Sequence, residues 1–71
     1  MNLIKILKER EITKLQLALK CEITPSDLYS AINGNKPFYP AWRRKISRYL
    51  EIDENEIFDG NYLKQEVEDE N

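Results

Sequence analysis

Two threonines, each followed three residues later by a polar side chain, are the groups whose spacing most clearly predicts a chemical interaction. Thr13 precedes Gln16, and Thr24 precedes Asp27. At a helix start, a threonine hydroxyl accepts a backbone hydrogen bond while the polar side chain bonds back, an arrangement called a capping box. The two threonines stand 11 residues apart. That spacing leaves room for one short helix, a turn of about three residues and a second helix.

The sequence holds no set of residues suited to catalysis or metal binding. It has no histidine and one cysteine, Cys21. One thiol cannot hold zinc, and the dispersed acids offer no nucleophile paired with a base. We therefore expect a protein that is not an enzyme and uses no metal or cofactor, and no small-molecule effector is evident. A single cysteine excludes an internal disulfide framework and is typical of a reducing compartment.

Charge is divided unevenly along the 71 residues. Residues 1–50 carry ten lysines and arginines against four acids (+6), and residues 51–71 carry one lysine against nine acids (−8). This split predicts a basic functional domain, residues 1–58, and an acidic tail, residues 59–71. No apolar run approaches the ~18 residues of a membrane span, and the start lacks a signal-peptide pattern. We expect a cytoplasmic protein with no membrane contact.

Apolar residues at helical spacing, with no strand-like alternation, predict a compact all-α bundle of about five short helices. Four helices are expected at about residues 3–10, 14–21, 25–33 and 41–50, and a short fifth helix is expected to start at the Asp53 cap and to end at Phe58 or soon after, before Gly60. Gly34 supplies a left-handed exit from the third helix, and Asp53 with Glu56 repeats the capping pattern at the fifth. In the fourth helix, the expected apolar stripe consists of Trp42, Ile46, Tyr49 and Leu50.

Basic residues open the fourth expected helix at positions 43–45, followed by Arg48. Such a segment is either a clamp for phosphate groups or a solvated helix face whose Arg48 pairs with a nearby acid. Because Trp42 and Ile46 are expected to face the core, the three consecutive cations cannot all point outward in one direction. Arg43 is favoured as a phosphate contact because it lies nearest the preceding loop.

Further positions complete a recognisable pattern around the two helix starts: Leu17, Ala18, Ile23, Ser26, Leu28, Asn33, Gly34, Pro40, Ile46, Leu50, Glu56, Ile57 and Phe58. With these, residues 2–58 resemble the Cro/C1-type (XRE) helix-turn-helix family of prokaryotic and phage DNA-binding regulators. The resemblance implies a bundle whose third helix enters the major groove while the second crosses the DNA backbone above it.

The resemblance also implies which residues contact double-stranded DNA. Lys14 and Asn33 match positions that contact phosphates, and Lys36 lies in the loop beside the backbone. Positions facing the bases are matched by Thr24, Pro25, Ser26, Tyr29 and Ser30. Together with Arg43, these residues are expected to form the DNA interface of a transcriptional regulator, such as a repressor, that acts as a homodimer. The fifth helix and the tail are the natural candidates for dimer contacts.

Three residues depart from the family pattern. Glu22 stands at a turn position usually held by glycine, where a left-handed backbone costs roughly 1 kcal/mol. Pro25 has no donor for a base, and Asp27 repels phosphates unless its carboxylate stays on the helix cap. Base readout is therefore expected to be modest. The alternative is a protein-interaction module, antitoxin-like or an adaptor, that retains the scaffold. The tail is either an inert end or a segment that competes with DNA.

Overall fold

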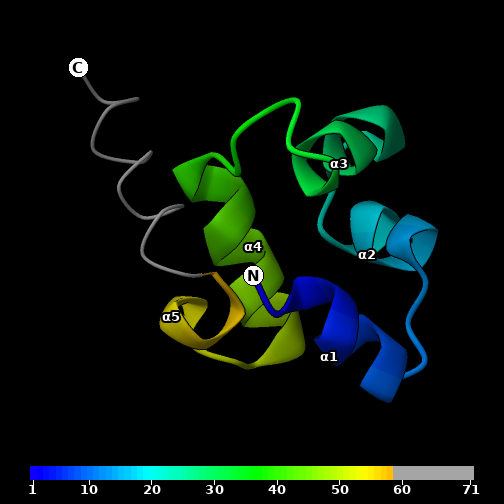
Figure 1. The fold of residues 1–71 in the computed structure, drawn as a ribbon. Coiled ribbons are helices and arrows are strands. Elements are labelled where there is room, and N and C mark those ends of the chain that lie inside the picture. The colour runs from blue at the N-terminus through cyan, green and yellow to red at the C-terminus, as the bar shows by residue number, and fades with distance from the viewer. Residues whose placement is uncertain (59–71) are drawn as a thin grey trace.

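The structure, a computed structural model, describes residues 1–58. Within that range it contains five helices and no strand (Figure 1): α1 Leu3–Glu9, α2 Lys14–Lys20, α3 Pro25–Ile32, α4 Pro40–Leu50 and α5 Glu54–Ile57. The all-α class is confirmed. The ends of α1 to α4 lie within one residue of those expected, and α5 follows its expected cap at Asp53 and ends one residue before Phe58. In this range no helix has the length and apolarity needed to cross a bilayer. The predicted tail, residues 59–71, lies outside the described residues.

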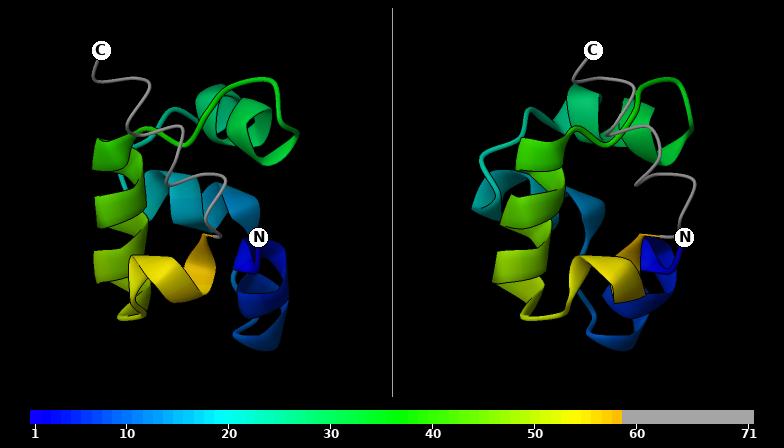
Figure 2. Two further views of the ribbon diagram at one scale, coloured as in Figure 1. Left: turned by 60° about the vertical axis from the view of Figure 1, so that its left-hand side comes forward. Right: turned by 90° about the vertical axis from the view of Figure 1, so that its left-hand side faces the viewer.

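The helices are arranged around α4, which runs along one side of the molecule (Figure 2). α3 lies near one end of α4, α1 and α5 lie near the other, and α2 lies between α1 and α3. The two ends of the described chain are joined, because the Asn2 backbone N–H donates to the Ile57 carbonyl oxygen at 2.9 Å. α3 lies at the end of the molecule away from this junction, and one of its faces is exposed.

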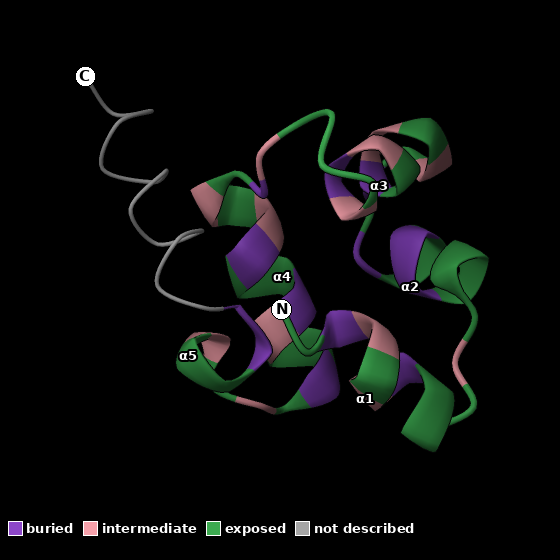
Figure 3. Ribbon diagram, viewed as in Figure 1, coloured by how far each residue is buried: buried purple, intermediate pink, exposed green. Residues whose placement is uncertain are grey.

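One hydrophobic core draws residues from all five helices, and it lies beneath their inward faces (Figure 3). Its buried members are Leu3, Leu7, Leu17, Ala18, Cys21, Ile23, Leu28, Ala31, Phe38, Ile46, Leu50, Ile57 and Phe58. The rings of Phe38 and Phe58 pack with centroids 5.0 Å apart. Cys21, the C-cap residue of α2, is a buried free thiol in this core.

The two predicted capping boxes have different outcomes. In α2 the box is confirmed, since the Gln16 N–H donates to Thr13 Oγ1 at 3.0 Å and the Thr13 N–H donates to Gln16 Oε1 at 2.8 Å. In α3 the prediction is wrong, because the Thr24 side chain makes no capping hydrogen bond. The Asp27 carboxylate, which was expected to bond back to Thr24, instead accepts from Lys36 Nζ at 2.6 Å.

The start of α5 follows its prediction only in part. The Asp53 carboxylate accepts from the backbone N–H of Asn55 at 2.8 Å and so caps the helix. The reciprocal bond expected from Glu56 is absent from the hydrogen bonds of the described residues. A helix of four residues is thus held by one side-chain cap and by the burial of Ile57.

The helices α1 to α4 all end in the same type of turn, in which one residue adopts the left-handed conformation. Glu11, Glu22 and Glu51 have φ values of 57°, 56° and 58°, and Gly34 has 87°. After α1, the Ile12 N–H donates to the carbonyl five residues earlier at 2.9 Å, and α2, α3 and α4 end with the same kind of bond. These bonds define the Schellman motif, which satisfies carbonyls that a helix end would leave open. The predicted exit at Gly34 and the left-handed Glu22 are confirmed.

α4 is rotated about its own axis relative to the prediction, so that a different set of side chains faces the core. Its buried residues are Arg43, Ile46 and Leu50, at i, i+3 and i+7. Trp42 is half-buried at the rim of the core, where Tyr39 packs edge-on against it with ring centroids 4.7 Å apart. Tyr49 is 39% exposed. The expected stripe was therefore right for Ile46 and Leu50, partly right for Trp42 and wrong for Tyr49.

Candidate nucleic-acid interface

The open face of α3 carries several of the residues expected to contact bases. Ser26, Tyr29 and Asn33 are all exposed, and their spacing of i, i+3 and i+7 aligns them along one stripe. Beside the stripe lie Thr24, which is exposed, and Pro25 and Ser30, which are half-buried. The hydroxyl and amide groups can donate and accept hydrogen bonds at base edges, and the Tyr29 ring offers an apolar contact.

The opposite face of α3 is buried against the rest of the bundle, and this fixes which residues point outward. Leu28 and Ala31 are fully buried in the core. α3 packs against α2, and the two helices are joined by residues 21–24. On α2 the packing residues are Leu17 and the small Ala18, both fully buried. The pair thus has the helix lengths and the short connection that the sequence predicted.

The two lysines that were expected to contact DNA phosphates differ in how much of their positive charge is available for that contact. Lys14 is exposed at the first residue of α2 and forms no ion pair with a described residue. Lys36 is also exposed, but its ammonium lies 2.6 Å from Asp27 Oδ1. The hydrogen bond that the Lys36 ammonium donates to Asp27 raises the pKa of Lys36 above its ordinary value. The pair removes much of the repulsion expected from Asp27, and it also reduces the attraction that Lys36 can offer a phosphate.

Arg43 is fully buried, and its expected role as a phosphate contact is wrong. Its Nε lies 3.3 Å from Glu54 Oε1, and its Nη1 donates a hydrogen bond to the Phe38 carbonyl oxygen. The side chain therefore joins α4 to α5 and to the loop before α4. A buried guanidinium needs such partners, because removing a charge from water is costly.

The cations that α4 does expose are Arg44, Lys45 and Arg48. Their spacing of i, i+1 and i+4 places them on one face of the helix, and none is ion-paired with a described residue. All three belong to the basic segment identified in the sequence, but Arg43 was the residue expected to contact a phosphate. The spacing of Ile46 and Leu50 contained the correcting signal, since position 43 lies on the same helical face as both. A basic stripe, defined as Arg44, Lys45 and Arg48, was missed for that reason.

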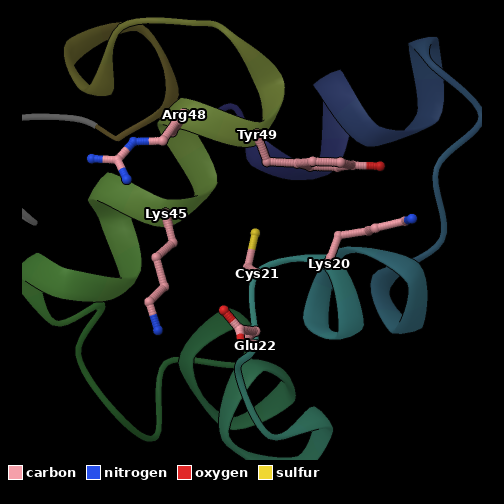
Figure 4. Close-up of a pocket in the computed structure, with 6 residues that line it drawn as sticks. All are labelled: Lys20, Cys21, Glu22, Lys45, Arg48 and Tyr49. Carbon is pink, nitrogen blue, oxygen red and sulfur yellow. The ribbon is translucent and has the colours of Figure 1, made fainter.

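A groove of about 320 Å³ lies between this stripe and the turn that joins α2 to α3 (Figure 4). It is lined by Lys20, Cys21, Glu22, Lys45, Arg48 and Tyr49. The Cys21 sulfur points into the centre of the view, with the Tyr49 ring on one side and Lys45 on another. Burial raises the pKa of the Cys21 thiol, and the nearby charge of Lys45 opposes that rise. Sequence spacing gave no sign of this groove, because its residues come from separate helices.

Among the described residues, the most exposed large hydrophobic side chains lie on α2 and not on α5. Ile57 and Phe58, which belong to α5 and its end, are buried in the protein's own core. On α2, however, Leu15 is 48% exposed and Leu19 is 64% exposed. These two side chains are four positions apart and so lie on one face of the helix. The tail, the other expected dimer contact, lies outside the described residues.

No cluster of three or more potential metal ligands occurs among residues 1–58. Comparisons with protein-family models, with curated protein sequences and with solved structures found no match to this chain. The resemblance to the Cro/C1-type family therefore stays a prediction.

Proposed function

We propose that this protein binds double-stranded DNA through α3 and acts as a cytoplasmic transcriptional regulator of the helix-turn-helix type. The observation that carries the proposal is the exposed stripe of Ser26, Tyr29 and Asn33 on a helix whose other face is buried. A helix held in this way presents fixed polar groups to the major groove, which is wide enough to admit it.

Phosphate contacts in this proposal are fewer than the sequence indicated. Lys14 keeps an unpaired charge, Asn33 supplies a neutral amide, and Lys36 is shared with Asp27. The basic stripe of α4, whose three charges have no ion-pair partner among the described residues, adds long-range attraction without contacting the duplex. If about two phosphates are neutralised per protomer, the log–log dependence of the DNA association constant on salt has a slope of about −1.8. With so few phosphate contacts, one protomer should bind DNA weakly. A two-fold dimer should bind more tightly, because it makes these contacts twice.

The experiment that tests the function is selection of binding sites from a random duplex pool at low salt. The proposal expects enrichment of a palindrome whose half-sites are separated by about 34 Å, one helical turn. Enrichment of a single half-site would support the same interface in a monomer. A pool that stays random after repeated selection at ~50 mM salt, where even non-specific phosphate contacts are strong, would contradict the proposal.

A second candidate function is a protein-interaction module, and the exposure of Leu15 and Leu19 favours it. Large aliphatic side chains on one face of a surface helix are typical of protein contact sites. A partner bound there would be lost on Leu19→Glu, because a carboxylate would be buried without a partner. The same substitution leaves the α3 stripe unchanged. Loss of protein association with retained DNA binding would assign the two surfaces to separate tasks.

A further inference from the structure

The groove between α4 and the α2–α3 turn has the composition of a small ligand site. Its volume of about 320 Å³ lies at the lower end of the range for ligand pockets, about 300–1,000 Å³. The Cys21 thiol, 3% exposed, contributes to its floor, and the Tyr49 ring forms a partly exposed aromatic wall. An aromatic group could stack on this ring and displace water from the thiol surface.

The rim of the groove carries excess positive charge. Lys20, Lys45 and Arg48 contribute three cations, and Glu22 contributes the one carboxylate, so the lining has a net charge of +2. None of these four groups is in an ion pair with a described residue. In Figure 4, Lys45 runs along the groove towards Glu22, while the charged ends of Lys20 and Arg48 lie to either side. Long basic side chains can keep their methylenes on the wall and place their charge at the rim.

We propose that this groove binds a small aromatic anion, such as an aromatic phosphate or carboxylate. The ring lies against Tyr49 and Cys21, and the anionic group is bound by Lys45 and Arg48 at the rim. The proposal does not rest on DNA binding by α3. The ligand would be a small-molecule effector, for which no motif in the sequence gives a sign.

The position of the groove separates it from the proposed DNA contact at Lys14. Lys14 begins α2 and Lys20 ends it, and a helix of seven residues is about 10 Å long. The groove also includes Glu22 from the turn itself, two residues before the N-cap of α3. A ligand seated there would contact both the turn and α4, and so would stabilise their relative position.

The test uses the full chain and phenyl phosphate as the probe, with amide NMR shifts as the readout. We expect saturable shifts at residues 20–22 and 45–49. The K45Q/R48Q double variant should weaken binding about tenfold or more, since two charge-assisted contacts are lost. Arg44→Gln is the matched control, because Arg44 is an exposed cation of the same helix that does not line the groove. It should change affinity by less than about twofold.

Two further arms separate possible sources of the anionic group. Inorganic phosphate alone should bind about tenfold or more weakly than phenyl phosphate, because it has no ring to bury. A short DNA duplex should not produce the groove shifts at residues 45–49. Equal affinity for inorganic phosphate would contradict the aromatic ligand. Groove shifts with duplex and none with phenyl phosphate would assign the cations to the DNA backbone and overturn the proposal.

Alkylation of Cys21 by iodoacetamide gives a second readout that does not depend on the charge variants. The thiol is buried and its pKa is raised, so the native protein should react slowly. Phenyl phosphate should slow the reaction further in the wild type and in Arg44→Gln. Unchanged alkylation at saturating probe would contradict a ligand seated on the thiol. So would the absence of any saturable NMR shift at ~20 mM probe, well above a millimolar dissociation constant.

Discussion

Arg43 occupies a position where a small helical domain ordinarily buries a hydrocarbon side chain. Its guanidinium is fully buried, and its partners are the Phe38 carbonyl and a Glu54 carboxylate that is 30% exposed. The exposed side of Glu54 keeps part of its hydration, which reduces both the desolvation cost and the Coulomb gain of the pair. The arginine thus fixes where α5 lies against α4.

Replacing Arg43 should affect stability rather than DNA affinity. Arg43→Ala leaves a cavity and removes the donor of two hydrogen bonds, and we expect a loss of about 3 kcal/mol in the free energy of unfolding, at the low end for a buried pair. Arg43→Met fills more of the volume and should lose less. Urea unfolding measures both variants, with Arg44→Ala as the exposed control, expected within about 0.5 kcal/mol of wild type. Weakened DNA binding by Arg43→Ala at unchanged stability would refute the structural role.

The left-handed glutamates are a second feature at the scale of single residues. Glu22 has φ of 56°, a conformation that costs a residue with a Cβ about 1–2 kcal/mol. Glu22→Gly removes that strain but gives the unfolded chain more freedom, so the net gain in stability should be at most about 1 kcal/mol. Gly34→Ala introduces the same strain at φ of 87° and should cost about 1 kcal/mol.

Thermal unfolding of these two variants checks the argument, since one removes the strain and the other adds it. An alanine side chain at position 34 would make no steric clash, because a Cβ built there meets no atom within 4 Å. A loss of stability in Gly34→Ala would therefore reflect backbone conformation alone. If both variants were destabilised equally, side-chain contacts of Glu22 would have to outweigh its backbone strain.

At the scale of elements, helix starts and ends were largely predictable because they depend on neighbouring residues. The capping box at Thr13 and the exit at Gly34 involve groups at most a few positions apart. The second box failed because Asp27 meets Lys36, nine positions along the chain, once the loop folds back. Similarly, local spacing located α4 and placed position 43 on its inward face, but it could not supply the partner of a buried arginine, since Glu54 belongs to the next helix. The α3 stripe was predictable, and the groove, which joins separate helices, was not.

The two threonines allow a matched test of helix capping. Thr13→Ala removes a hydrogen bond to the Gln16 N–H and should cost about 1 kcal/mol. Thr24→Ala removes no capping bond, so it should change stability by less than about 0.5 kcal/mol. Chemical denaturation of the two variants under one buffer condition compares them directly. A similar loss in both would mean that the Thr24 hydroxyl caps α3 in solution.

At the scale of the whole molecule, charge is separated between the folded domain and the tail. Residues 59–71 carry one lysine and five acids, a net charge of −4, so residues 1–58 have a net charge of +2 within the total of −2. The basic stripe and Lys14 would therefore attract DNA more strongly if the acidic segment were removed.

Truncation after Phe58 tests whether the tail competes with DNA. We expect higher affinity for a selected duplex in the truncated chain, with a difference that decreases as salt screens both charges. Fluorescence anisotropy at two salt concentrations measures the effect. Equal affinities at low salt would favour the interpretation of the tail as an inert end.

The most direct test of the central claim compares two tyrosines in binding to the selected duplex. Tyr29 on α3 and Tyr49 on α4 are each 39% exposed, so both substitutions to alanine remove similar surface. We predict that Tyr29→Ala weakens binding about tenfold, within the range for a contact to a base, while Tyr49→Ala changes it by less than about twofold. Circular dichroism verifies that both variants keep the fold. Equal effects, or a larger loss in Tyr49→Ala, would contradict recognition of DNA by the open face of α3.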